Sequence, residues 1–535
     1  MMKKIFINIS YILVLAVSFS SCKKSLTDQY NNPELTSKAS LATLFTGILN
    51  NDRVRPAYWN QRTYLMPHSA VYAQTASFDN VNTVYQQIDG YVGNYWSDFY
   101  YPAGNGSGPM AIYRTMEKAY AALSPADQAS QAVFLQAAKI VMYDQASKMI
   151  DAWGDIPFTD AGSLETYSVI KDPKFDDAKT TYNTLISGLN DAAAFFKSAV
   201  LPANTAASFS KQDILLSGST DQWRRYANSI RLRLLMRISF VDETSAKTAV
   251  TAMLANSTEY PLIDGANSGT YNPATTDVLL QPLTNYTNTP RSALTEIDSY
   301  FAPDYMVNKV MAPANDPRLP VMFDKFGQTT GGVFVPNPTY KAMPITFTND
   351  QQTTQYTQYA IVDSATFVDN GKIPGIAITA PEVNFLKAEA FERWGSTGDA
   401  ETAYKIAVQQ SISFYYYLNS ISSSPRAKTS APSSDAITAF LKAANVAYTG
   451  SSDDKLAKIW IQKWVNFGLL QSDEAWSEYR RTKYPKLTFV PQTLNPYQLP
   501  PTRLTYPSVE TGFNTNYSAV KAKDTRTTKI FWDVK

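Results

Sequence analysis

Apolar residues recur at helical spacing in five separated blocks of the chain, with polar residues on the opposite positions. Ser124 before Pro125, and the acids Asp176 and Asp221, stand where helix-capping residues are expected. Thr379 and Glu382 have the spacing of a capping box. The pattern therefore predicts a mainly helical protein. The blocks cover 124–150, 176–196, 221–238, 382–416 and 456–470, and a short helix is expected at 474–481.

The block 382–416 predicts a pair of helices rather than one. The helical pattern breaks at Gly395–Asp399 and resumes with Ala403, Tyr404 and Ala407. Glycine and aspartate followed by alanine at this distance are typical of the turn and second helix of a tetratricopeptide-like unit. We therefore expect helix pairs that stack on one another.

Three long stretches, 61–107, 260–379 and 485–535, are rich in Asn, Thr, Pro and Tyr and show no helical period. They are longer than ordinary connections, which favours functional loops with a few short strands. No Gly/Ser linker or charge block divides the chain. We therefore expect residues 22–535 to form one large domain.

The N-terminus has the pattern of a bacterial lipoprotein signal. Lys3 and Lys4 precede an apolar run that is too short to span a bilayer, and Cys22 follows small residues at its end. We expect residues 1–21 to be removed and Cys22 to carry a lipid that anchors the protein, although an ordinary secretory signal is the alternative. Cys22 is the chain's single cysteine, so no internal disulfide is possible.

The charge composition argues against nucleic-acid binding. The two lysines of the signal leave with it, so the remaining chain has equal numbers of basic and acidic residues. The arginines of the 221–238 block are therefore expected to pair with carboxylates of neighbouring helices. Arg481 should do the same, and Arg480 should pair or stack on Trp476. The arginines of that block are Arg224, Arg225, Arg231, Arg233 and Arg237.

Several motifs occur in an order that resembles the SusD/RagB family of nutrient-binding outer-membrane lipoproteins, in its divergent SusD-like subgroup. The similarity runs from Cys22 to Pro507. The motifs are Asp151–Phe158 (DAWGDIPF), Trp223–Arg233 (WRRYANSIRLR), Asp316–Leu319 (DPRL), Phe385–Ala390 (FLKAEA), Ile461–Trp464 (IQKW), Glu474–Arg481 (EAWSEYRR) and Arg503–Pro507 (RLTYP).

This resemblance implies a mainly α fold, with tetratricopeptide-like helix pairs in a right-handed superhelix, long loops and a few short strands. It also implies a protein that captures an oligomeric nutrient, a glycan or a peptide. The captured oligomer would pass to a partner TonB-dependent SusC-like channel in the outer membrane. Surface display is expected, although Lys23 and Lys24 replace the acidic residues that often follow the lipidated cysteine in displayed members.

Aromatic residues outside the helical blocks are the candidate ligand contacts. The chain has 34 Tyr, 26 Phe and 9 Trp, and amphipathic rings suit sugar rings or peptide side chains. A neighbouring group (Tyr95, Trp96, Phe99 and Tyr100) is instead expected to form the buried start of a helix that continues through Ile112 and Met116. The candidates are Trp59, Tyr64, Tyr72, Phe78, Tyr85, Tyr286 and Tyr305.

Two other functions remain open at this point. Asp151, Asp155 and Asp160 lie close together, and paired carboxylates would suit an exported glycan hydrolase. We favour a turn in which Asp155 accepts hydrogen bonds from backbone amides, and hence a protein that is not an enzyme. The third possibility is a scaffold that binds proteins through its helix pairs and takes no small ligand.

No cofactor or metal is expected. His68 is the only histidine, so multi-histidine metal sites are excluded and His68 is expected to make a loop contact. Gly104–Gly108 lacks the lysine of a phosphate-binding loop and is expected to form a flexible turn.

Overall fold

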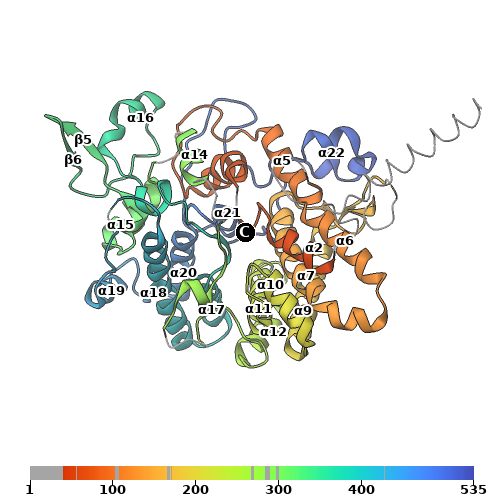
Figure 1. Ribbon diagram of the computed structural model, residues 1–535. Coiled ribbons are helices and arrows are strands. Elements are labelled where there is room, and N and C mark those ends of the chain that lie inside the picture. The colour runs from red at the N-terminus through yellow and green to blue at the C-terminus, as the bar shows by residue number, and fades with distance from the viewer. Residues whose placement is uncertain are drawn as a thin grey trace, which may run out of the picture.

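The computed structural model describes residues 40–535 except 56, 103–107, 165–168, 170, 267–269, 283–288, 297–300 and 427. The predicted mainly helical fold is confirmed (Figure 1). The longer helices are α2 (Leu41–Leu49), α5 (Asp89–Tyr100), α6 (Pro109–Ala121), α7 (Pro125–Trp153), α9 (Ala178–Ser198), α10 (Ala203–Gln212), α11 (Thr220–Arg237), α12 (Glu243–Ala255), α14 (Thr289–Glu296), α17 (Ala380–Trp394), α18 (Thr397–Ile421), α19 (Ser434–Leu441), α20 (Ser452–Phe467) and α21 (Ser472–Thr482).

Shorter helical turns fill much of the remaining chain. They are α3 (Tyr58–Asn60), α4 (Val71–Ala73), α13 (Pro273–Thr276), η2 (Tyr305–Met311), η3 (Ala312–Ala314), α15 (Leu319–Met322), α16 (Asn349–Gln355), η4 (Tyr356–Gln358), η5 (Ser364–Val368), α22 (Ser508–Phe513), η6 (Thr515–Ala519) and η7 (Lys521–Lys523). In Figure 1, α5, α6 and α7 lie on one side of the molecule, α15, α18 and α19 lie on the other, and α21 lies between them.

Capping residues set the starts of the predicted helices, in two cases one or two positions from the expected residue. Ser124 accepts a hydrogen bond from the amide of Asp127 and caps α7, as predicted. Asp177, not Asp176, caps α9, and Ser219, not Asp221, caps α11. The prediction chose an acid beside the true cap because both residue types can accept this bond.

The helix pair 382–416 is confirmed as α17 and α18, which pack against each other and are separated by Gly395 and Ser396. Thr379 caps α17 by accepting from the amide of Glu382. The capping box is not closed, because both carboxylate oxygens of Glu382 accept hydrogen bonds from Arg233 instead.

The prediction that 61–107 is irregular was wrong for 61–73, whereas 74–88 is irregular as expected. Gln61–Ala70 forms the π-helix η1, which continues into α4. The i→i+5 hydrogen bonds of a π-helix shift side chains away from the 3.6-residue period, so the apolar pattern did not reveal it. The expected helix from Tyr95 through Met116 is instead two helices, since α5 ends at Tyr100 and α6 starts after Gly108.

The strands that the described residues form are short and paired antiparallel, as expected for the long non-helical stretches. Three of the four ribbons lie within 260–379. The pairs are β1 (Ile156–Pro157) with β2 (Phe175–Asp176), β3 (Val278–Leu280) with β8 (Gly375–Ile378), β4 (Phe323–Asp324) with β7 (Ile361–Val362), and β5 (Gly327–Thr330) with β6 (Val333–Pro336).

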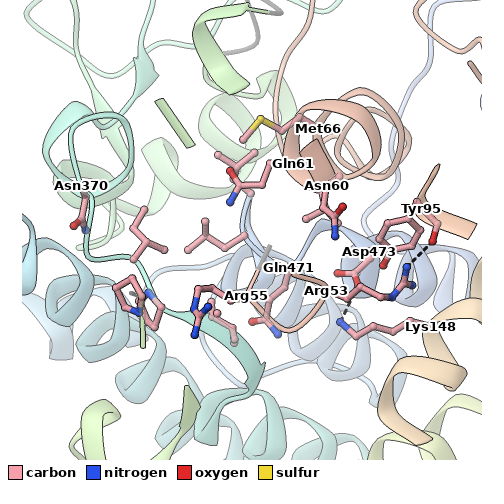
Figure 2. A pocket seen from close by; sticks show the side chains of 18 of the residues that line it. Arg53, Arg55, Asn60, Gln61, Met66, Tyr95, Lys148, Asn370, Gln471 and Asp473 are labelled. Carbon is pink, nitrogen blue, oxygen red and sulfur yellow. Dashed lines mark hydrogen bonds and ion pairs between the residues drawn. The ribbon is translucent and has the colours of Figure 1, made fainter. Parts of the chain in front are cut away.

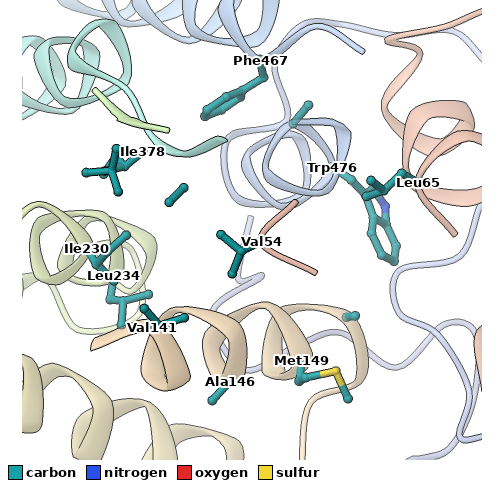
Figure 3. Close-up of a cluster of buried hydrophobic side chains, with 14 of the residues drawn as sticks. Val54, Leu65, Val141, Ala146, Met149, Ile230, Leu234, Ile378, Phe467 and Trp476 are labelled. Carbon is teal, nitrogen blue, oxygen red and sulfur yellow. The ribbon is translucent and has the colours of Figure 1, made fainter. Parts of the chain in front are cut away.

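The core combines segments from the whole length of the chain (Figure 3). Met149 on α7, Leu234 on α11, Ile378 on β8 and Trp476 on α21 belong to one cluster of buried side chains. Leu65 on η1 belongs to the same cluster. The π-helix is therefore part of the core and not a surface loop.

A buried network of charges crosses this core and confirms the pairing predicted for Arg233, Arg237 and Arg481. Arg233 Nε lies 2.6 Å from Glu382 Oε1, and Arg237 Nη2 lies 2.5 Å from Glu474 Oε2. Arg481 Nη2 lies 2.6 Å from Glu389 Oε2. The network joins α11, α17 and α21, and its charges are compensated within the protein.

Arg480 stacks on Trp476, as the sequence predicted. Its guanidinium carbon lies 3.7 Å from the centroid of a ring of Trp476, so the planar cation stacks on the indole. Every guanidinium nitrogen of Arg480 also donates a hydrogen bond.

The stability of the fold is expected to be greatest at about pH 4–5 and to fall on both sides. Burial raises the pKa of Asp98 and of Asp277 to about 7, so the folded state keeps protons that the unfolded chain loses above pH 3.8. The lowered pKa of buried His68, about 4, acts in the opposite direction, but the two aspartates outweigh this single group, so stability should fall as pH rises from about 4 to 7.

On the acid side, burial alone would raise the pKa of Glu389 and Glu474. Neighbouring Arg and Lys charges outweigh it and lower each pKa to about 2. Below pH 4.5 the unfolded chain then binds protons that the folded state does not bind, so stability should be lost as pH falls towards 2. Urea unfolding between pH 3 and 8 tests this, and stability that increases steadily from pH 4 to 7 would contradict it.

Candidate functional site

Of the predicted ligand contacts that the structure describes, Trp59 is the most exposed. It lies in the single turn of α3, just before the π-helix η1, and its side chain is 47% exposed. The Tyr58 ring lies 5.0 Å from a ring of Trp59 at 68°, so the indole is supported at its edge. An exposed indole held by a neighbouring ring can stack on the apolar face of a ligand.

Polar groups contact Tyr58 and Arg62, the neighbours of Trp59 in the chain. Tyr58 Oη and Arg62 Nε both donate to Glu296 Oε2 at the end of α14, the second at 3.0 Å. The Arg62 guanidinium carbon lies 5.5 Å from the centroid of the Tyr91 ring. We call these five residues, Tyr58, Trp59, Arg62, Tyr91 and Glu296, the Trp59 surface.

The hydroxyl of Tyr58 stays protonated at neutral pH. Partial burial and the hydrogen bond to Glu296 raise the pKa of Tyr58. Tyr58 thus remains a donor to Glu296, and the carboxylate is held between two donors. The Trp59 surface therefore offers an aromatic face, a cation and a fixed carboxylate, which is the mixture that recognises hydroxyl-rich ligands.

Phe78 and Tyr85 come together at a second place. Both line a cleft of about 50 Å³ with Asn80, Asp304 and Gln352. Tyr85 is buried, with its ring edge towards Phe489, and Phe78 is partly buried. This cleft is small, so it fits a side group of a ligand rather than an oligomer.

Tyr64 and Tyr72 do not reach a surface, and we withdraw them as ligand contacts. Tyr64 is 2% exposed and its ring lies 3.6 Å from the Tyr95 ring in a near-parallel stack. The Tyr72 ring packs 5.3 Å from Trp476 on α21. The physical reason is that η1 and α4 are core helices, so the residues on their inner faces are buried.

The remaining candidates are less informative. The half-buried ring of Tyr305 lies 6.2 Å from a ring of Trp464, edge to face. Tyr286 and the lipidation candidate Cys22 lie outside the described residues.

The sequence did not indicate a larger cavity beside α5. Its volume is about 360 Å³, and Tyr100, Tyr101, Leu164 and Val169 are among the residues that line it. Tyr100 had been assigned to the core, and it lines this cavity while also packing against Phe99. Its neighbour Tyr101 is exposed, and no pattern in the sequence marked either residue as lining a cavity.

The three acids proposed as hydrolase candidates all form contacts within the fold. Asp155 Oδ1 accepts from the amide of Ala178 at 2.9 Å, a backbone amide as expected but one at the start of α9 rather than in its own turn, and Oδ2 pairs with Lys523 Nζ at 2.8 Å. Asp151 accepts from the Tyr182 hydroxyl and from the Trp532 indole. Asp160 lies 2.9 Å from Lys171. None of these contacts resembles a pair of free carboxyl groups facing a common space.

His68 is buried within η1 and is not the loop residue that was expected. Burial lowers its pKa to about 4, so the imidazole is neutral at physiological pH. Its Nε2 accepts from the amide of Ile88 at 3.4 Å. Among the described residues, no cluster of three or more His, Cys, Asp or Glu side chains is placed to hold a metal ion.

The chain is similar to proteins of one family over nearly its whole length. A family model described as "SusD-like_2: Starch-binding associating with outer membrane" matches residues 31–507. No curated protein sequence matches the chain significantly. None of the helices in the described ranges is long and apolar enough to cross a bilayer.

Solved structures share the fold. A chitin-binding protein has a TM-score of 0.70 at 23% identity, covering 92% of this chain and 99% of its own. A SusD homologue from Bacteroides vulgatus has a TM-score of 0.66 at 20% identity, covering 95% and 99%. A chitin-binding SusD homologue from Flavobacterium johnsoniae has a TM-score of 0.65 at 20% identity, covering 92% and 99%.

Proposed function

The chain belongs to the SusD-like family of starch-binding proteins associated with the outer membrane, and from this premise we propose that it captures a glycan oligomer without cleaving it. The captured glycan is passed to a partner TonB-dependent SusC-like channel for import. The protein is held at the outer membrane by a lipid on Cys22 and faces the cell surface.

The observation that carries the proposal is the Trp59 surface. An exposed indole packs against the Tyr58 ring, and the Tyr58 hydroxyl donates to Glu296 of the Arg62–Glu296 pair. Sugar rings offer an apolar face to such an indole and hydroxyl groups to such a pair. Two relatives that share the fold are described as chitin-binding, so chitooligosaccharides and starch fragments are the first ligands to test.

Co-purification from native membranes tests the delivery role. The tagged protein, isolated from outer membranes in mild detergent, is expected to bring down one TonB-dependent channel in about equal amount, because a capture protein must sit at its channel. The variant Cys22→Ser is the control, and it should fail to reach the membrane fraction. A preparation that contains the lipidated protein but no channel would contradict delivery and would favour a free-standing binding protein.

A further inference from the structure

A mostly apolar cavity lies between η1, the segment 370–376 and the start of α21 (Figure 2). Its volume is about 60 Å³. One buried water needs about 10–15 Å³ on this measure, so the cavity has room for a few waters or for a group of a few heavy atoms. Its apolar walls are formed mainly by Leu65, Met66, Ile373, Ile376, Leu469 and Leu470.

The charged residues of the lining interact within the protein and do not select an ion. Lys148 Nζ lies 2.8 Å from Asp473 Oδ2, so this pair is neutral. Arg53 and Arg55 each donate to a backbone carbonyl, at 2.6 and 2.9 Å, and each lies near an aspartate. The group that fits this cavity is therefore expected to be uncharged.

Gln471 is the unusual polar residue of the lining. It stands at the N-cap of α21 and is 4% exposed, yet its side chain makes no capping hydrogen bond. Within the described part of the chain, its amide has no hydrogen-bond partner. Three other buried glutamines, Gln87, Gln352 and Gln410, each donate and accept within the fold. The Gln471 amide is therefore able to bond a group inside the cavity.

Asn60 offers a second uncharged polar group. Its Nδ2 donates to the carbonyl of Asp52 at 3.0 Å, and its Oδ1 accepts no hydrogen bond from the residues that the structure describes. Figure 2 shows Asn60 and Gln471 approaching the cavity from separate segments, one on α3 and the other at the start of α21. A ligand group between them can donate to Asn60 Oδ1 while it accepts from Gln471 Nε2.

The cavity lies next to the Trp59 surface along the chain. Asn60 directly follows Trp59 on α3. Because consecutive Cα atoms are about 3.8 Å apart, an oligomer that stacks on Trp59 extends past the residue that lines the cavity. Ile373 and Leu470 in the lining are half-buried, so the lining reaches the surface at these residues. A substituent of a glycan held at Trp59 is therefore within reach of the cavity.

We propose that this cavity binds the acetamido group of an N-acetylated sugar. Its carbonyl oxygen accepts from Gln471 Nε2, its N–H donates to Asn60 Oδ1, and its methyl group packs on Leu65 and Met66. A water or a sugar hydroxyl can use the two amides but not the apolar walls, whereas the acetamido group uses both. The inference rests on the proposed glycan capture and adds the class of glycan that is preferred.

Calorimetric titration of the mature protein with chitohexaose and with cellohexaose tests the proposal. The two oligomers share their linkage and differ in having an acetamido group or a hydroxyl on each ring. We expect chitohexaose to bind about 10-fold more tightly. Gln471→Met keeps the length of the side chain and removes its hydrogen-bonding atoms. It should weaken chitohexaose by about 10-fold and leave cellohexaose unchanged.

Gln409→Met on α18 is the matched control, because Gln409 is exposed and does not line the cavity. It should bind both oligomers as the wild type does. The thermal midpoint of each variant is measured first. Ile373→Trp, at a half-buried part of the lining, is the second variant if Gln471→Met does not fold. The larger side chain should fill the cavity and remove the preference for chitohexaose.

Equal binding of the two oligomers by the wild type overturns the acetamido site and leaves glycan capture standing. The site is also overturned if Gln471→Met and Ile373→Trp both keep the wild-type preference for chitohexaose. If the wild type binds neither oligomer, the capture of these glycans fails together with the site. Trp59→Ala should weaken both oligomers by the same factor, since the indole stacks on the sugar ring. A loss confined to chitohexaose in that variant would place the acetamido group at Trp59 and overturn the cavity as its site.

Discussion

Replacement of Arg237 by alanine is expected to lower the free energy of unfolding by about 3–5 kcal/mol. Arg237 lies on α11 and pairs with Glu474 and Glu478 of α21, and its Nε is 3.3 Å from Asp151. The alanine variant leaves three buried carboxylates without this cation. Arg233 still lies 3.4 Å from Glu474 and Arg481 still lies 2.7 Å from Glu478, but the desolvation of the three carboxylates is then only partly compensated, which is the main cost of breaking a buried pair.

Urea unfolding at neutral pH measures the change. Arg426→Ala is the control, since the side chain of Arg426 is 60% exposed and its pair with Asp369 is a surface pair. That variant should lose less than about 1 kcal/mol. Arg237→Lys should fall between the two, because it keeps the charge but has one nitrogen in place of three. A loss of unfolding free energy below about 1 kcal/mol for Arg237→Ala would show that the buried charge network does not stabilise the fold in the way proposed.

Trp59→Ala is expected to weaken the binding of a neutral oligosaccharide by about 10- to 100-fold, which corresponds to about 1.4–2.8 kcal/mol. The indole is the exposed aromatic face of the Trp59 surface, and alanine offers no ring for a sugar to stack on. Calorimetry with chitohexaose and with maltoheptaose measures the effect. The thermal midpoint should stay near that of the wild type, because about half of the side chain is already in water.

Phe513→Ala on α22 is the control for an exposed ring, since Phe513 is 81% exposed and lies outside the Trp59 surface. It should bind both oligosaccharides as the wild type does. If Trp59→Ala binds as the wild type does, the glycan binds at another surface. The cavity lined by Tyr100 and Tyr101 is then the next candidate. Tyr85→Ala is not useful in combination with Trp59→Ala, because Tyr85 is buried and its removal would alter the stability of the protein.

The helices were predictable where they are amphipathic and begin with a capping residue. Ser124 and Pro125 located α7, and the break after Trp394 located the pair α17 and α18. The π-helix η1 was missed because its hydrogen-bond spacing gives no 3.6-residue signal. The local pattern of apolar residues therefore predicts regular α-helices but does not predict a π-helix.

The candidate site was predictable only in part, because burial of a tyrosine depends on tertiary packing. Trp59 and Tyr64 are five positions apart in similar sequence, and one is exposed while the other stacks on Tyr95 inside the core. The charge balance of the chain predicted that Arg233 and Arg481 pair with carboxylates, and both do.

The way η1 is held in the core has a consequence for the order of folding. The Ser69 hydroxyl lies 2.9 Å from the Ser472 hydroxyl, 403 positions away, and the Trp464 indole donates to the carbonyl of Ala73, 391 positions away. Contacts of this separation cannot form until nearly all of the chain is present. The N-terminal segment therefore packs into the core only once α20 and α21 are present, and a chain cut short before residue 464 lacks the partners that hold its π-helix.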